Sequence, residues 1–302
     1  MTFFEILHSW WGETLFVIIT GHLTIMCTSL YMHRSQAHQG VEFNPVVSWA
    51  MRWYLWLFTG MSTRQWVAVH RKHHAFCETE NDPHSPVILG WASVLFFGVK
   101  YYRDAYNDPT TMERFTSGTP NDWIERNIFT PHKIIGIVIL LAIDVLIFGF
   151  VAGPLVWLGQ VLWVPFWAAG VVNGLGHTIG YRNYAVRDES RNMVPFGFLL
   201  SGEELHNNHH KFPASARFSQ RWFELDMGWM YIQALRLFGL AKVKVVHQGI
   251  PTFKRSALAA KEAALEKAME AGHAVSEAMS HAKEVAKEAA ASKKPAALGA
   301  DY

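Results

Sequence analysis

Three long apolar stretches constrain this chain more than any other feature of its sequence. They are Thr14–Met32, Ile134–Gly153 and Leu155–Leu175. The first and third contain no charged residue, and the second contains only Asp144. A helix rises about 1.5 Å per residue, so each stretch is long enough to cross a hydrocarbon layer of roughly 30 Å. Charged residues make up 17% of the chain, against about 25% in soluble domains. We therefore expect an all-α integral membrane protein with about three transmembrane helices.

The remaining composition excludes several kinds of protein. The cysteines, Cys27 and Cys77, lie far apart and form no C-x-x-C pair, so no disulfide framework, zinc ribbon or iron–sulfur motif is expected. A formal net charge of +2 gives no reason to expect a nucleic-acid partner. The first residues, MTFFEILHSWW, lack the basic segment of a signal peptide, so the first apolar stretch is predicted to be retained.

The composition also changes near residue 250. Residues 1–250 are predicted to form the membrane domain with a cytoplasmic helical cap. Residues 251–302 are rich in Ala, Glu and Lys and are predicted to form a helical or partly disordered tail. A coiled-coil partner site in the tail is the weaker alternative, because Gly272 and several alanines dilute the apolar stripe.

Histidines are clustered at spacings that suit metal ligands. His33 and His38 form H-x-x-x-x-H, and the H-x-x-H-H pattern occurs twice, at His70, His73 and His74 and at His206, His209 and His210. Chance predicts far fewer than one copy of this pattern among 302 residues with 16 histidines. Helix positions i, i+3 and i+4 project from one face, so each H-x-x-H-H presents its rings to one side. His33 and His38 can converge only if the helix ends or loosens between them.

A ninth histidine, His177, follows Asn173 at a spacing of four in N-G-L-G-H, so both side chains share a helix face. Alone it would be interpreted as a packing residue, but beside eight clustered histidines it becomes a candidate ligand. Nine imidazoles exceed one zinc site, which closes at about four ligands, so a dinuclear centre is predicted. Imidazole suits iron, copper, nickel or zinc. Carboxylate-bridged di-iron proteins would show paired E-x-x-H motifs, and the sequence has none.

A single site requires all clusters on one side of the membrane. The apolar segment Val46–Met61 therefore cannot cross and should lie in the interface, with Arg52 reaching lipid headgroups, and Val87–Val99 should stay on the metal side. Residues 1–13 contain no Lys or Arg, whereas both cluster near the histidines. This bias predicts a cytoplasmic site, with the N-terminus outside.

These motifs together resemble those of a known family. HRSQAH, HRKHH followed by CETENDPHSP, VVNGLGHTIGYR and GEELHNNHH are similar to the boxes of membrane-bound acyl-CoA (Δ9-type, stearoyl-CoA-like) fatty acid desaturases, over roughly residues 15–230. The resemblance implies that nine histidines hold two iron ions and that an asparagine holds a metal-bound water. By motif match these are His33, His38, His70, His73, His74, His177, His206, His209, His210 and Asn173. Relatives commonly have two spans before the first box, whereas this chain has room for one.

The resemblance also implies an activity. It implies an O₂-dependent enzyme that introduces a cis double bond, at Δ9, into a saturated acyl-CoA. No electron-transfer module is fused, so electrons would come from a separate ferredoxin or cytochrome b5 with its NAD(P)H reductase. Composition, with no compartment signal, suggests a bacterial inner membrane. A di-iron hydroxylase of acyl chains, sterols or alkanes is the alternative. A metal transporter is less consistent, because its ligands would lie inside the spans.

Two finer expectations concern carboxylates. Six of them are candidates to orient the histidine rings: Glu42, Glu78, Asp82, Asp188, Glu203 and Glu204. Asp144 lies in the middle of an apolar stretch, where a carboxylate usually faces a partner. His22 lies at a similar predicted depth, so a direct or one-water contact between Asp144 and His22 is predicted.

Overall fold

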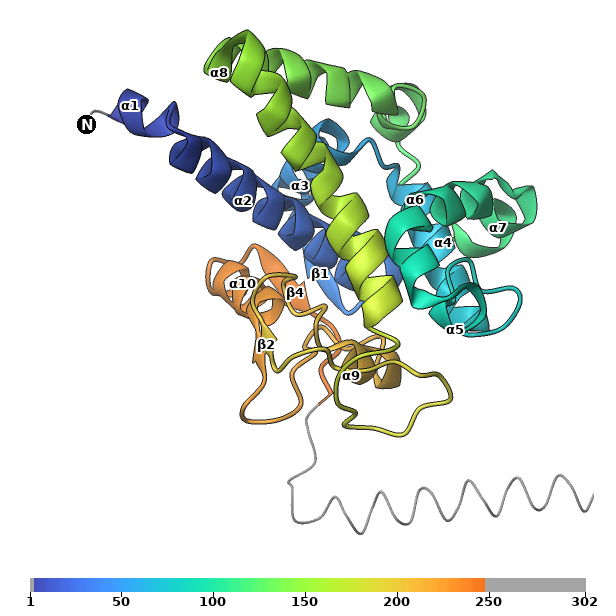
Figure 1. Cartoon of the computed structure of the whole chain (residues 1–302). Coiled ribbons are helices and arrows are strands. Elements are labelled where there is room, and N and C mark those ends of the chain that lie inside the picture. The colour runs from blue at the N-terminus through green and yellow to red at the C-terminus, as the bar shows by residue number, and fades with distance from the viewer. Residues whose placement is uncertain (1–2, 248–302) are drawn as a thin grey trace, which may run out of the picture. The chain divides into compact units, whose positions relative to one another are not determined.

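The structure, a computed structural model, describes residues 3–247 and is mainly helical (Figure 1). The predicted tail at 251–302 lies outside the described residues. The helices are α1 (Phe3–Leu7), α2 (Trp10–Cys27), α3 (Pro45–Thr59), α4 (Thr63–Phe76), α5 (Pro86–Leu89), α6 (Trp91–Asn107), α7 (Pro109–Phe115), α8 (Lys133–Val164), α9 (His206–Lys211) and α10 (Met227–Leu237). Three segments have the wider turns of a π-helix: η1 (Thr28–Ala37), η2 (Glu125–Phe129) and η3 (Pro165–Leu175). The strands form two short pairs, β1 (Val41–Phe43) antiparallel to β4 (Ala241–Val243), and β2 (Phe196–Gly197) parallel to β3 (Leu225–Asp226).

The first long apolar helix is α2 together with η1. It begins after Ser9, whose hydroxyl accepts a hydrogen bond from Gly12 N at 3.2 Å. Trp10–Ala37 is long and apolar enough to cross a membrane. At its C-terminal end the turns widen, and His38 N donates to His33 O at 3.1 Å, five residues back. The predicted loosening between His33 and His38 is therefore present, in the form of η1.

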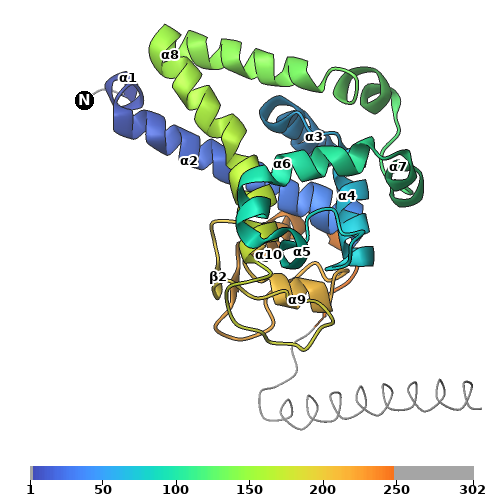
Figure 2. The ribbon, with the colours of Figure 1, turned by 45° about the vertical axis from the view of Figure 1, so that its right-hand side comes forward.

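The second long apolar helix is α8 continued by η3, which spans Lys133–Leu175. It is sharply bent at Gly149, whose φ of 83° and ψ of 177° are open only to glycine. Figures 1 and 2 show the resulting two limbs. Near the bend the limbs fold back on each other, because Trp157 Nε1 donates to Ile137 O at 2.9 Å. The two limbs correspond to the second and third apolar stretches, and the number of membrane crossings remains a prediction.

Arg52 on α3 corrects one expectation. The sequence predicted that its side chain reaches lipid headgroups, but it is 7% exposed. Its guanidinium pairs with Asp122 at 2.6 Å and with Glu125 at 3.1 Å. A buried guanidinium needs compensating carboxylates, and here the segment before α8 supplies them. Arg52 therefore fastens α3 to that segment.

The predicted contact between His22 and Asp144 is wrong. His22 Nδ1 donates to the backbone oxygen of Leu199 at 3.2 Å, and Nε2 accepts from the Tyr231 hydroxyl at 2.9 Å. Phe198 stacks on the same ring with centroids 5.7 Å apart. Asp144 is buried, and its Oδ2 has no hydrogen-bond partner within residues 3–247. The prediction considered only depth along the helices and ignored partners distant in sequence, here Leu199 and Tyr231.

The segment from Ser201 to Asp226 is fastened to η1 by Arg34, whose side chain is fully buried. The guanidinium donates to both carboxylate oxygens of Asp226, at 2.9 and 3.1 Å. It also donates to the backbone oxygens of Ser201 and Ala216, at 2.8 and 2.9 Å. Because α9 lies between these two residues in sequence, Arg34 holds the segment carrying α9 against the end of the first long helix.

Candidate metal centre

The structure brings together all nine histidines predicted from the sequence. They form two groups, and in each group one candidate ligand atom per residue lies within 4.8 Å of the others. The first histidine group is His33, His38, His70, His74 and His209. The second histidine group is His73, His177, His206 and His210. Two adjacent groups of four and five rings agree with the predicted dinuclear arrangement, although their role as ligands remains a prediction.

The nitrogen-to-nitrogen distances allow a test of fit. Two imidazoles about 2.1 Å from one ion, with about 90° to 109° between them, place their nitrogens about 3.0 to 3.4 Å apart. In the first group, Nε2 of His209 lies 3.0 Å from Nε2 of His33 and 2.9 Å from that of His74. In the second, Nε2 of His206 lies 3.1 Å from those of His177 and His210. The separations of 3.0 and 3.1 Å fit ring nitrogens directed at one ion per group, whereas His209–His74 at 2.9 Å and His38–His70 at 2.8 Å lie slightly below this range.

Each H-x-x-H-H motif contributes to both groups. On α4, His70 and His74 enter the first group, while His73 enters the second. A step of three residues turns a helix by about −60°, and a step of four by about +40°. The rings therefore share one side of α4 yet diverge enough to reach different ions. α9 does the reverse: His206 and His210 join the second group and His209 joins the first.

Four of the six candidate carboxylates accept a hydrogen bond from Nδ1 of a histidine. The pairs are His33–Glu203 at 2.8 Å, His73–Asp82 at 3.0 Å, His177–Glu78 at 3.0 Å and His210–Asp188 at 3.0 Å. A bond at Nδ1 fixes the ring and leaves Nε2 for a metal. The other two candidates differ. Glu42 pairs with Lys244 near the surface, and Glu204 accepts from the backbone N–H groups of Leu200 and Gly202.

Burial sets the protonation of the centre. Removal from water lowers the pKa values of five rings well below the ordinary value for histidine, and neighbouring histidines add to the effect. The rings are His70, His74, His206, His209 and His210. Neutral imidazole is the form that binds metals, so burial favours the metal-binding form of these five rings.

Asn173 and His84 lie beside the second group. Asn173 is on η3, one turn before His177, and lines the same cavity as His206. His84 was not singled out from the sequence. It is buried, stacks on His73 with centroids 4.5 Å apart, and has no hydrogen-bond partner at Nε2 within the described residues. The motif D-P-H at residues 82–84, shortly after the second box, was the available signal, and Asp82 of that motif accepts from His84 N at 3.1 Å.

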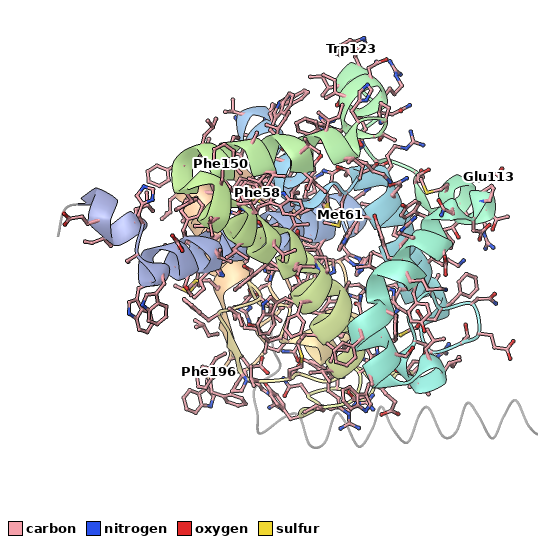
Figure 3. The ribbon with its side chains drawn as sticks, turned by 45° about the horizontal axis from the view of Figure 1, so that its top comes forward. Phe58, Met61, Glu113, Trp123, Phe150 and Phe196 are labelled. Carbon is pink, nitrogen blue, oxygen red and sulfur yellow. The ribbon has the colours of Figure 1, made fainter. Side chains whose placement is uncertain are left out.

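An apolar cavity of about 440 Å³ adjoins the centre. At one end it is lined by His33, His70, His84 and His206. Elsewhere its walls come from α2, α3, α4, α6 and both limbs of α8. Figure 3 shows Met61, which lines the cavity, towards the middle of the molecule, while Phe150 lies at the bend of α8 and Trp123 at the outer edge. The volume is within the range of small-molecule sites, and the walls suit a hydrocarbon chain.

A helical scaffold with two long apolar helices and a buried histidine centre beside an apolar cavity is the arrangement expected of a metal-dependent enzyme that acts on hydrophobic substrates. Comparison with known proteins refines this class. The family model "Fatty acid desaturase" matches residues 8–243. The chain belongs to the fatty acid desaturase family and is an oxidoreductase of lipid metabolism.

Curated relatives agree on the family and differ in substrate. The chain is 32% identical over 230 residues to an sn-1 stearoyl-lipid 9-desaturase of Anabaena variabilis, covering 74% of this chain and 79% of the relative. It is 29% identical over 237 residues to the Delta-9 desaturase-like 2 protein of Arabidopsis thaliana, covering 76% of each. It is 30% identical over 260 residues to an acyl-CoA 5-desaturase of Anemone leveillei, covering 82% and 77%.

Proposed function

We propose that this fatty acyl desaturase introduces a cis double bond at Δ9 of a saturated acyl-CoA and uses two iron ions. The observation that carries the proposal is the convergence of nine imidazoles, in two groups, at the end of an apolar cavity. The Δ9 position is supported by two of the relatives described above. The acyl-CoA carrier is supported by the acyl-CoA desaturase among them.

The proposed ligands are the nine histidines of the two groups, with Asn173 placed to hold a metal-bound water. When bound, the iron pair would use O₂ and two external electrons to oxidise an unactivated methylene pair. In sum, one CH₂–CH₂ unit, O₂, two electrons and two protons give one CH=CH unit and two waters. The chain's own residues do the rest: Glu78, Asp82, Asp188 and Glu203 hold rings in place.

The cavity residues would fix which carbons react. Its apolar walls exclude water and hold the acyl chain extended past the histidines, so that one methylene pair lies at the centre. The position of the double bond then depends on how far the chain can enter.

We further propose the membrane arrangement and partners. α2 with η1 and the two limbs of α8 would form three spans, in a bacterial inner membrane, with the centre facing the cytoplasm. Residues 1–250 would form the catalytic domain, residues 251–302 a separate tail, and a ferredoxin or cytochrome b5 system would deliver electrons. Reporter fusions at residues 5 and 62 test the topology, and a cytoplasmic residue 5 with an external residue 62 would contradict it.

Fatty acid profiling of an expressing host tests the reaction. The expected products are cis-Δ9 monounsaturated chains, formed only with O₂, and metal analysis of the purified protein should give two irons per chain. Hydroxy fatty acids as the only new products would replace the desaturase with the related hydroxylase. A single zinc without iron would contradict the di-iron centre.

A further inference from the structure

His84 is a buried histidine that belongs to neither histidine group and has an unused ring nitrogen. It is 6% exposed. Nε2 of the ring is enclosed by the protein and has no hydrogen-bond partner within residues 3–247. Nearly all buried polar atoms in proteins are hydrogen-bonded, so an exception indicates a catalytic group or a partner such as an ion or a water molecule. The proposed ligands do not include His84, and the proposed reaction gives its ring no role.

Asp82 fixes the position of His84 relative to the second group. Its Oδ1 accepts from His84 N at 3.1 Å and from His73 Nδ1 at 3.0 Å, so one oxygen holds the backbone of His84 and the ring of His73. The other oxygen of Asp82 accepts from Glu78 N at 2.8 Å. Candidate ligand atoms of Asp82, His73 and His84 lie within 4.8 Å of one another, but both carboxylate oxygens are already used by N–H donors. These three residues are therefore better described as a rigid support for His84 than as a separate metal site.

The stack between His84 and His73 sets the distance from His84 to the second ion. The ring centroids are 4.5 Å apart, with 27° between the planes. An ion at Nε2 of His73 would lie about 2.1 Å from that nitrogen, close to the plane of the ring. A ring stacked on this plane is about twice a metal–nitrogen bond away, so His84 is too distant to be a further ligand. An atom bound to the ion on that side is within reach, because a bond of about 2.1 Å and a hydrogen bond of about 2.8 Å together span the gap.

The second group has room for such an atom. It contains four rings, whereas the first group contains five. Non-haem iron enzymes keep positions free of protein ligands for molecules from outside. His84, Asn173 and His206 all line the cavity, while His73 does not. A position left free on the second ion is therefore expected on the cavity side, where His84 lies.

We propose that Nε2 of His84 forms a hydrogen bond with a small ligand at the open position of the second ion. The proposal rests on the proposed function for the presence of the ion. The gap between ring and ion is spanned by one bound atom, so the ligand class is water or a small anion such as azide. A neutral imidazole carries one N–H, so His84 can donate to such a ligand without becoming charged. His84 would hold the ligand beside the cavity, in addition to Asn173.

The binding test uses azide as the probe on purified, iron-loaded protein in detergent, without turnover. Absorption of the azide complex gives the Kd. His84→Phe keeps an aromatic ring that can stack on His73 but removes both nitrogens, and should weaken azide binding about 10-fold or more. His84→Gln keeps an N–H donor and should bind azide more tightly than His84→Phe. Tyr102→Phe is the matched control, since it removes another unpartnered, buried polar atom from the cavity wall, on α6, and should bind azide as the wild type does.

The outcomes that would overturn the hydrogen bond are specific. Azide binding unchanged in His84→Phe would exclude it, as would equal losses in His84→Phe and His84→Gln or in Tyr102→Phe. Metal analysis checks the centre. Both His84 variants should keep the iron content of the wild type, and loss of iron would make His84 a ligand instead.

Steady-state kinetics distinguish this role from that of an ordinary cavity wall. His84→Phe should lower kcat and leave KM for the acyl substrate unchanged, because the ring contacts the ligand on the ion rather than the chain. A higher KM with an unchanged Kd for azide would show that His84 only shapes the cavity. A host that gains no double bond would refute the proposed reaction and leave the azide comparison intact. A wild-type protein without iron would refute the di-iron centre, and the azide comparison would then be made on Co²⁺-loaded protein.

Discussion

The two histidine groups are held in place by different forces. In the second group, three of four rings donate Nδ1 to a carboxylate, from Asp82, Glu78 or Asp188. In the first group, among the described residues, His33 alone has such a partner, Glu203. The first group is packed by aromatic rings instead. Trp66 stacks on His70 with centroids 4.9 Å apart, and Phe218 packs on His209 at 4.8 Å.

In the proposed di-iron centre, this difference would make the two ions unequal. Neutral imidazoles leave the charge of a metal ion uncompensated, so nearby carboxylates raise affinity for a cation. Three carboxylates neutralise the second site more than one neutralises the first. We therefore expect the second ion to be held more tightly and the first to be exchanged more easily.

Loss of a ring should abolish activity in either group. His209→Ala removes a ring from the first group and His210→Ala one from the second, while the surrounding helices stay packed. Product should fall below detection in both variants, and each purified protein should lose iron. His132→Ala is the control, because His132 is exposed and outside both groups. Wild-type product from either ligand variant would mean that its ring does not bind metal.

Arg34 connects the two histidine groups. It directly follows His33 in sequence, and its side chain forms hydrogen bonds with the segment that carries α9. Arg34→Met leaves the buried carboxylate of Asp226 unpaired, which should destabilise the protein by about 3–5 kcal/mol. Arg34→Lys should lose part of the same stability, because lysine cannot bind both oxygens of Asp226 in the same way. Denaturation midpoints measure stability, and the rate of iron release to a chelator measures the effect on the centre.

Arg52→Lys provides the comparison, because Arg52 forms an ion-pair cluster with Asp122 and Glu125 away from the histidines. It should lower stability without accelerating iron release. Equal acceleration in Arg34→Lys and Arg52→Lys would show that Arg34 acts only through global stability.

The residues of the centre also show which features could be predicted from the sequence and which could not. Spacing identified all nine converging rings and the loosened turn at His33, because both depend on local helical geometry. Asp82 and Glu78 could be proposed as ring partners because they follow the second box closely. The partnership of His33 with Glu203 spans 170 residues and depends on tertiary packing, as does the burial of Arg52. No local pattern distinguishes Glu203, which contacts a ring, from its neighbour Glu204, which does not.

Loss of a carboxylate that bonds to a ring should weaken iron binding less than loss of a ring. Which of the two ions is affected should depend on the group that the carboxylate supports. Asp82→Asn and Asp188→Asn should each weaken iron binding about 10- to 100-fold, and both should affect the same step of a two-step chelator titration. Glu203→Gln should affect the other step. Glu42→Gln is the control, since Glu42 pairs with Lys244 away from the centre. A loss of both steps together in every variant would show that the two ions are not held independently.

Asp144 tests whether pairing, rather than burial, makes a carboxylate stabilising. Like Asp82 it is buried, but its Oδ2 has no hydrogen-bond partner within residues 3–247, in an apolar helix where such a group is costly. Asp144→Asn removes the ionisable group at nearly constant shape, so stability should stay equal or rise slightly, with iron content and product unchanged. Asp82→Asn, in contrast, should lower both iron content and product. Thermal unfolding in one detergent compares the two variants directly. A loss of more than about 2 kcal/mol in Asp144→Asn would mean that a lipid or a second chain pairs with Asp144, because removing a satisfied buried partner carries a cost of that size.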